Sequence, residues 1–118
     1  MTWNVELHDD FEPEFDGLDE AIKDALLKRL ALLKIKGPQL GRPTVDTLER
    51  SRHPNLKELR FNEGGGVWRF AFAFDPERQA IILCGGDKAG ENQKAFYRWL
   101  IDLADARFDD HLEKQKGN

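Results

Sequence analysis

Hydrophobic residues alternate with polar or small residues in four stretches of the chain, a spacing typical of β-strands. The first stretch is residues 2–7, where Trp3, Val5 and Leu7 share one face. The other three stretches span residues 56–61, 67–74 and 79–85. Gly-rich and Pro-containing turn sequences at residues 62–66 and 75–78 join these last three, so they are predicted to form an antiparallel meander.

Two other segments show the spacing of amphipathic helices. In the first, apolar residues recur at Leu18, Ile22, Leu26, Leu30 and Leu33. Asp16 is a suitable N-cap for this helix, and Gly37-Pro38 is expected to end it. The second helix is predicted over residues 91–114, and a short helical turn is expected near residues 45–48, within the long connection 37–54.

The order strand, helix, three strands, helix predicts one α+β domain spanning residues 1–118, with a small antiparallel sheet and the helices packed on one face. In the strand 67–74 the large residues Trp68, Phe70, Phe72 and Phe74 fall on one face. We expect this face to meet the helices, and Arg69, Ala71 and Ala73 to lie on the open side. By the same alternation Glu58 and Arg60 lie on the side of Arg69, and the alanines leave a hollow beside the two arginines.

Two interpretations of Arg60 and Arg69 remain open at this point. They are either solvated cross-strand charges with Glu58 as a partner, or an anion site, because guanidinium groups bind phosphate through paired hydrogen bonds. Lys88 follows the last strand in the loop 85–90 and is expected near the same face. That loop lacks the spacing of a nucleotide-binding P-loop.

Other candidate chemistry is sparse. His8, His53 and His111 do not have metal-ligand spacing, and Cys84 is the single cysteine, so neither a metal site nor a cofactor is predicted. His53 precedes the arginine-bearing strands and is either a proton carrier at their face or a surface loop residue. Tyr97 is either a packing residue or a hydroxyl that reaches the loop containing Lys88.

The net charge of −4 is unevenly distributed over the 118 residues. Residues 1–24 hold nine acidic residues and Lys23, a charge of −8, which leaves +4 on residues 25–118. The mildly basic body permits an anionic partner. No apolar run approaches the roughly 20 residues of a membrane helix, and the first residues lack the pattern of a signal peptide, so a cytoplasmic protein with no membrane partner is predicted.

Several ordered blocks of the chain resemble a known family. They are Gly41-Arg42-Pro43, residues 45–48, Ser51 to Arg60, Trp68 to Pro76, Ile81-Ile82-Leu83, Gly85 to Gly90, Phe96-Tyr97-Arg98, Ala104-Asp105 and Phe108 to Leu112. Together they resemble the HigB-like, phage-derived branch of the RelE/ParE toxin superfamily. The similarity covers nearly the whole chain.

The resemblance implies a RelE-like fold and the toxin of a type II toxin–antitoxin system, with a helix-turn-helix antitoxin, the ribosome and mRNA as partners. It also implies a metal-independent mRNA endoribonuclease that inhibits translation. On this resemblance Arg60 and Arg69 would hold the phosphate and Lys88 would assist binding or the leaving oxygen. Lys57 is a further candidate for RNA binding, and His53 or Tyr97 is a candidate proton carrier.

Two alternatives keep the fold but not the reaction. The chain is net acidic, whereas toxins that bind ribosomes are often strongly basic. A non-catalytic ParE-like toxin that binds gyrase, or an inactive relative that only binds its antitoxin, is therefore also consistent with the sequence.

Overall fold

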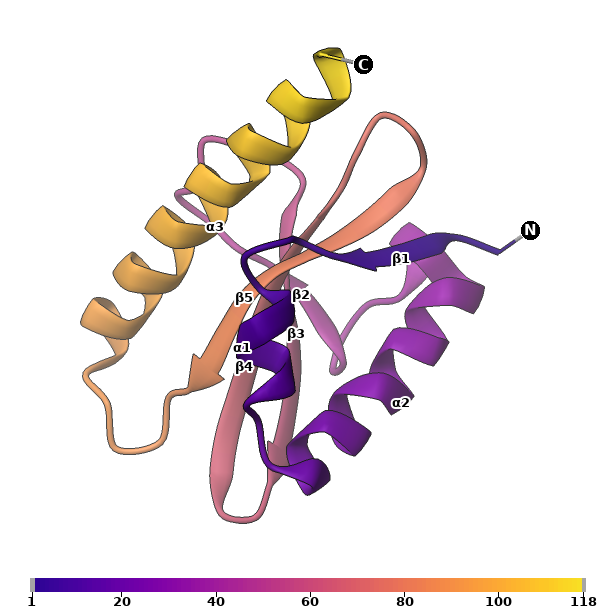
Figure 1. Ribbon diagram of the computed structural model, residues 1–118. Helices are drawn as coiled ribbons and strands as arrows, with labels where there is room; N and C mark the ends of the chain where they lie inside the picture. Colours follow the sequence, from indigo (N-terminus) through magenta and orange to yellow (C-terminus); the bar gives the residue numbers. More distant parts are fainter. Residues whose placement is uncertain (1, 118) are drawn as a thin grey trace.

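The computed structural model describes residues 2–117, which form a five-stranded sheet with helices on both of its faces (Figure 1). In chain order the elements are β1 (Asn4–Leu7), α1 (Glu12–Asp16), α2 (Glu20–Lys36), the 3-10 helix η1 (Gly37–Gln39), β2 (Val45–Thr47), β3 (Leu56–Glu63), β4 (Gly66–Phe74), β5 (Gln79–Asp87) and α3 (Gln93–Lys116). The strand order is β1-β5-β4-β3-β2, and only the β1–β5 pair is parallel. The α+β class and the antiparallel meander β3–β4–β5 are confirmed.

The β3–β4 hairpin sets the register of the central strands. Gly64 and Gly65 both have positive φ, 57° and 81°, the geometry of a tight type I′ turn that matches the twist of the strands. The turn places Arg60 opposite Arg69 and Glu58 opposite Ala71. The two arginines therefore share a face, as their alternation predicted.

The aromatic face of β4 packs against α2, as expected. Phe70 and Phe72 are 1% and 0% exposed, and Phe11, just before α1, packs edge-on against Phe70 at 6.0 Å between ring centroids. The residues that α2 contributes to this core are Ile22, Ala25, Leu26, Leu30 and Leu33. Burial of these side chains is the main stabilising term on this side of the sheet.

The opposite face of the sheet is covered as well, so the prediction that all helices pack on one face is wrong. Helix α3 lies across Ala71 and Ala73, both fully buried, and contributes Phe96, Leu100, Ala104 and Phe108 to a second core. Figure 1 shows α3 and α2 on opposite sides of the strands. The two alanines admit the helix at close range because their side chains are small, so the hollow expected beside the arginines is filled by α3.

Two further predictions of secondary structure are wrong, one about where a helix begins and one about the type of an element. The long helix begins at Glu20 with Asp19 as its N-cap, not at Asp16, which ends the separate helix α1. Residues 45–47 form β2 rather than a helical turn, because Val45 and Asp46 pair with Leu59 and Glu58 of β3. No helix within residues 2–117 is both long enough and apolar enough to cross a membrane.

Histidine–aspartate contacts secure the C-terminal half of α3. The pairs are His8 with Asp110 (3.0 Å), His53 with Asp109 (2.8 Å) and His111 with Asp75 (2.8 Å). They tie α3 to the end of β1, to the β2–β3 connection and to the β4–β5 turn, respectively. The N-terminal half of α3 lies beside the arginines, where the hydroxyl of Tyr97 donates to Glu58 at 2.8 Å.

Candidate functional site

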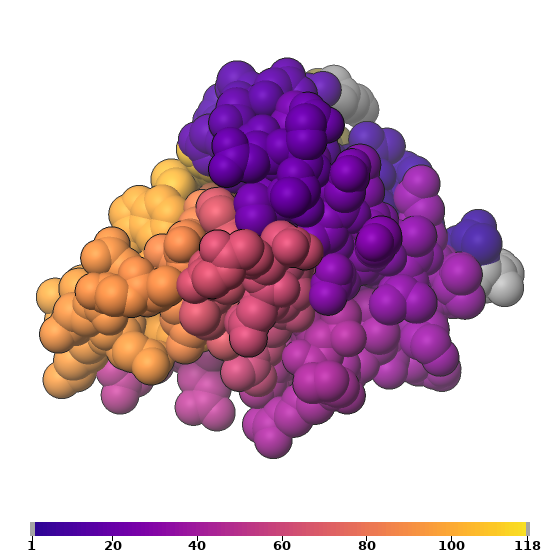
Figure 2. All heavy atoms as spheres, turned by 90° about the horizontal axis from the view of Figure 1, so that it is seen from below, coloured from indigo at the N-terminus to yellow at the C-terminus, as the bar shows by residue number. Residues whose placement is uncertain are grey.

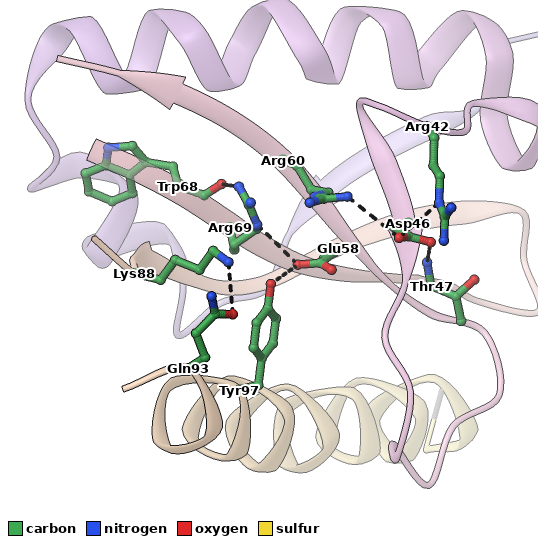
Figure 3. A network of polar contacts seen from close by, with 10 residues as sticks. All are labelled: Arg42, Asp46, Thr47, Glu58, Arg60, Trp68, Arg69, Lys88, Gln93 and Tyr97. Atoms are coloured by element: carbon green, nitrogen blue, oxygen red, sulfur yellow. Dashed lines mark hydrogen bonds and ion pairs between the residues drawn. The ribbon is translucent and has the colours of Figure 1, made fainter. Parts of the chain in front are cut away.

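Arg60, Arg69 and Lys88 come together beside the first turns of α3 (Figure 3). Arg60 of β3 lies opposite Arg69 of β4, which in turn lies opposite Gly86 of β5. Lys88 follows β5 directly, and its backbone N–H donates to the carbonyl of Val67 at 2.8 Å. Three adjacent strands therefore supply three cationic side chains to one surface.

Arg69 is the most enclosed of the three cations, with 8% of its side chain exposed. Its Nε lies 3.5 Å from Oε1 of Glu58, and the hydroxyl of Tyr97 donates to the same oxygen at 2.8 Å. Nη1 of Arg69 donates to the carbonyl of Trp68 at 2.9 Å, whereas its Nε has no hydrogen-bond partner within residues 2–117. A buried guanidinium with an unused donor is suited to bind an added anion.

Arg60 is more accessible, with 34% of its side chain exposed. Its Nη1 is 3.7 Å from Oδ2 of Asp46, to which Nε of Arg42 donates at 3.2 Å. A hydrogen bond from the backbone N–H of Thr47 and another from Arg42 lower the pKa of Asp46, which is therefore ionised at neutral pH. The long Arg60–Asp46 distance leaves the guanidinium of Arg60 available to a ligand.

Lys88 and Tyr97 form the side of the site next to α3. Nζ of Lys88 donates to Oε1 of Gln93 at 3.2 Å and lies 5.4 Å from the centroid of the Tyr97 ring. Partial burial, with the nearby charge of Arg69, lowers the pKa of Lys88 below its usual 10.5. Burial and the hydrogen bond to Glu58 raise the pKa of Tyr97 above 10.0. An ammonium whose pKa is lowered releases its proton more readily than a solvated lysine.

Two of the residues proposed from sequence are not brought to this surface. The ring of His53 packs edge-on against Phe108, with 4.9 Å between centroids, and contacts Asp109. Asp109 lies 12 positions after Tyr97 in α3, about 18 Å along the helix axis. Lys57 pairs with Phe72, on the face of the sheet that packs against α2, and donates to Thr47 at 3.1 Å.

From the sequence, Glu58 was expected only as an ion-pair partner of the arginines, and two roles were left open for Tyr97. Glu58 lies two positions before Arg60, so its place on the same face was predictable, but its burial at 7% exposure and its shared contact with Tyr97 were not. The contact depends on α3 covering this face of the sheet. The resulting group of three cations and two carboxylates, Glu58 and Asp46, has the donors to hold a phosphate and the acids and bases to move protons near it.

The arrangement of strands and helices defines a RelE-like fold. The structure aligns with a doubly substituted mutant of the Escherichia coli toxin RelE in the free state, with a TM-score of 0.62 and 12% identity over 86% of this chain and 95% of that one. It also aligns with RelE of the Pyrococcus horikoshii RelE–RelB complex, with a TM-score of 0.55 and 18% identity over 76% of this chain and 99% of that one. At such identities these similarities establish the fold only.

Residues 13–109 match the family described as "Phage derived protein Gp49-like (DUF891)", and the chain belongs to this family. It is 44% identical over 98 residues to the Mycobacterium tuberculosis protein named "Putative toxin HigB2", covering 82% of this chain and 48% of that protein. It is 50% identical over 86 residues to "Putative toxin HigB3" of the same organism, covering 73% of each chain. The chain thus spans about half the length of the first relative. The HigB-like resemblance of the sequence is confirmed.

Proposed function

We propose that this protein is the toxin of a type II toxin–antitoxin system and acts in the cytoplasm by cutting mRNA on the ribosome without a metal ion. The observation that carries the proposal is the convergence of Arg60, Arg69 and Lys88 on one face of a RelE-like fold. Similarity to two proteins named as HigB toxins supports the toxin assignment. A cognate helix-turn-helix antitoxin is the proposed inhibitor.

In the proposed reaction the 2′-hydroxyl of one nucleotide attacks the adjacent phosphorus. A 2′,3′-cyclic phosphate forms and the bond to the 5′-oxygen of the next nucleotide breaks. Arg60 and Arg69 bind the phosphate oxygens and stabilise the charge that develops on them in the transition state. No metal ion is required, because two guanidinium groups supply the positive charge.

The two proton transfers are assigned to Glu58 and Lys88. The carboxylate of Glu58 accepts the proton of the 2′-hydroxyl, and its hydrogen bond from Tyr97 fixes its orientation. Protonation of Glu58 also weakens its attraction for Arg69, which frees that guanidinium for the phosphate. Lys88 gives its proton to the leaving 5′-oxygen, a step favoured by its lowered pKa.

One observation favours a second function, an antitoxin-binding relative without nuclease activity. Both arginines already face a carboxylate, Arg69 at 3.5 Å from Glu58 and Arg60 at 3.7 Å from Asp46. An incoming phosphate must compete with these carboxylates. If it does not compete successfully, the face remains a structural ion-pair network.

Expression of the protein with and without its neighbouring antitoxin tests the proposal. Wild type alone should arrest growth and cut messages within their coding regions, and co-expression of the antitoxin should restore growth. Arg60→Ala removes a partly exposed guanidinium and should abolish cleavage. Lys36→Ala, which removes an exposed cation from α2 on the other side of the sheet, serves as the matched control.

The alternatives give different results. Intact messages together with double-strand DNA breaks would select a gyrase-binding, ParE-like toxin. Normal growth together with a tight antitoxin complex would select the inactive relative. Equal cleavage by wild type and Arg60→Ala would show that the arginine face is not the nuclease site.

A further inference from the structure

A cavity of about 330 Å³ lies beside the candidate site, between the β2–β3 connection and the N-terminal half of α3. Arg50 lines it from the connection, and Lys94, Arg98 and Asp102 line it from successive turns of α3. Tyr97 and Ile101 contribute apolar surface to its wall. Figure 2 shows part of the 45–55 segment, in magenta at the lower left, beside the orange start of α3. The cavity therefore combines cations with a flat aromatic surface.

The arginines of this cavity differ from the others in the chain. Seven of the nine arginines are held by an ion pair, a side-chain hydrogen bond or an aromatic ring, namely Arg29, Arg42, Arg52, Arg60, Arg69, Arg78 and Arg107. Over residues 2–117, Arg50 and Arg98 make none of these contacts, and neither does Lys94. The two arginines without such contacts thus line one cavity, together with Lys94.

Their positions are locally unfavourable. Lys94 and Arg98 are like charges at positions i and i+4 in the first turns of α3, next to the positive end of the helix dipole. Arg50 has φ of 71°, in the left-handed region that non-glycine residues seldom adopt. A bound anion would offset the repulsion between Lys94 and Arg98.

The cavity shares a wall with the candidate catalytic face. Tyr97 lines the cavity, and its hydroxyl donates to Glu58 at 2.8 Å. Gln93 lines the cavity as well, and its side-chain oxygen accepts from Lys88 at 3.2 Å. A ligand in the cavity and a phosphate at Arg60 and Arg69 would therefore lie on the two sides of the same tyrosine.

We infer that this cavity binds a second nucleotide of the RNA strand whose phosphate is held at Arg60 and Arg69. The inference rests on the nuclease function proposed above. The base packs against Tyr97 and Ile101, since stacking on an aromatic ring suits any base. The phosphate of this nucleotide binds Arg50, Arg98 and Lys94. Asp102 accepts from an exocyclic amino group, which favours cytosine or adenine over uracil at this position.

Binding of fluorescein-labelled oligocytidine to the whole protein tests the inference by fluorescence anisotropy. The variant is Arg50→Ala/Arg98→Ala, which changes two exposed side chains. Lys28→Ala/Lys36→Ala is the matched control, because it removes two exposed cations from α2. The arginine variant should bind a hexanucleotide at least 10-fold more weakly than wild type and lose about 0.7 units of salt slope, the value for one phosphate contact on a single strand. The control should match wild type.

The length and the base identity of the oligonucleotide sharpen the test. Wild type should bind the hexanucleotide more tightly than a cytidine mononucleotide, and oligocytidine more tightly than oligouridine. The arginine variant should lose most of both differences. Equal affinity of wild type for the mononucleotide and the hexanucleotide would assign the cavity to a free nucleotide and overturn the inference.

Cleavage of a message on ribosomes, measured in parallel, separates this inference from the proposed function. If wild type cleaves but the arginine variant binds RNA as well as wild type does, the cavity inference is wrong and the nuclease function stands. If wild type does not cleave the message, and only the arginine variant loses RNA binding, the cavity inference stands and the nuclease function is wrong. Failure of wild type to bind the hexanucleotide overturns the inference.

Discussion

The Glu58→Gln variant separates the structural role of Glu58 from its proposed role as a base. The substitution preserves the shape of the side chain and leaves an amide oxygen that still accepts from the hydroxyl of Tyr97. It removes the negative charge 3.5 Å from Nε of Arg69. The catalytic proton acceptor and the counter-ion of Arg69 are therefore lost in one step, while packing is retained.

The expected loss in the free energy of unfolding follows from the burial of the Arg69–Glu58 pair. The side chains of Arg69 and Glu58 are only 8% and 10% exposed, so solvent screens them weakly. A unit charge pair near 4 Å contributes about 4 kcal/mol at an effective dielectric of 20, and breaking a buried pair costs about 3–5 kcal/mol. Because the amide still accepts hydrogen bonds, we expect Glu58→Gln to lower the free energy of unfolding by about 2–3 kcal/mol.

Function should change in two opposite directions. Arg69 no longer has a competing carboxylate, so affinity for an RNA oligonucleotide should rise about 10-fold at low salt, about 1.4 kcal/mol. Cleavage should nevertheless fall by about 100-fold, because general base catalysis of this kind contributes about 10²–10⁴-fold. Urea unfolding, fluorescence anisotropy and single-turnover cleavage of a programmed message on ribosomes measure the three quantities. Cleavage that rises together with affinity would show that Glu58 is only a counter-ion and would refute the proposed proton transfer.

Three further substitutions test other parts of the site and its support. Lys88→Arg should keep RNA affinity but lower cleavage about 10- to 100-fold, because guanidinium does not release its proton. In wild type the pKa of Lys88 is lowered, so cleavage should decline as pH rises through a value below 10.5, and the variant should lose this decline in a pH–rate profile. His53→Ala should leave the cleavage rate unchanged, and a 100-fold loss would return His53 to the catalytic group. Asp75→Ala should lower the free energy of unfolding by about 3–5 kcal/mol in urea, because a fully buried carboxylate that binds His111 and Gln115 is lost. Burial opposes the charge of Asp75, yet hydrogen bonds led by that of His111 lower its pKa. Its contribution should be complete above pH 3.8 and fade as pH falls through the lowered pKa, and a pH-independent difference between the proteins would argue against this linkage.

The meander was predictable because its signals are local. Alternation and the Gly64-Gly65 turn define β3 and β4 without reference to the rest of the chain. The same alternation gave the shared face of Arg60 and Arg69. Successive side chains of a strand point to opposite faces, so the alternation determines which residues share a face, regardless of what packs against that face.

The position of α3 was not predictable from the same signals. A strand face of alanines is compatible with solvent and with a closely packed helix, and nothing local to Ala71 and Ala73 distinguishes the two. The buried environment of Arg69, its contact with Glu58 and the position of Tyr97 all depend on α3 covering that face. Burial created by a distant segment is therefore the part of the site that the pattern could not supply.

Strand β2 and the placement of His53 illustrate the same limit. Three residues, Val45–Thr47, form a strand only because β3 offers them a free edge. His53 lies six positions after Thr47, but its contact with Asp109 directs it to the far half of α3. Proximity in sequence to an arginine-bearing strand did not determine on which part of the surface the ring would lie.

Cleavage of a defined message by the purified protein on purified ribosomes tests the central claim most directly. The 5′ ends produced by wild type and Arg60→Ala are mapped by primer extension, with Lys36→Ala as the control. In a separate reaction, wild-type protein is treated with EDTA and then added to the ribosomes. Wild type and Lys36→Ala should cut within the coding region, EDTA treatment should leave the activity unchanged, and Arg60→Ala should make no cuts. A message left intact by wild type, or cut equally by Arg60→Ala, would contradict the central claim.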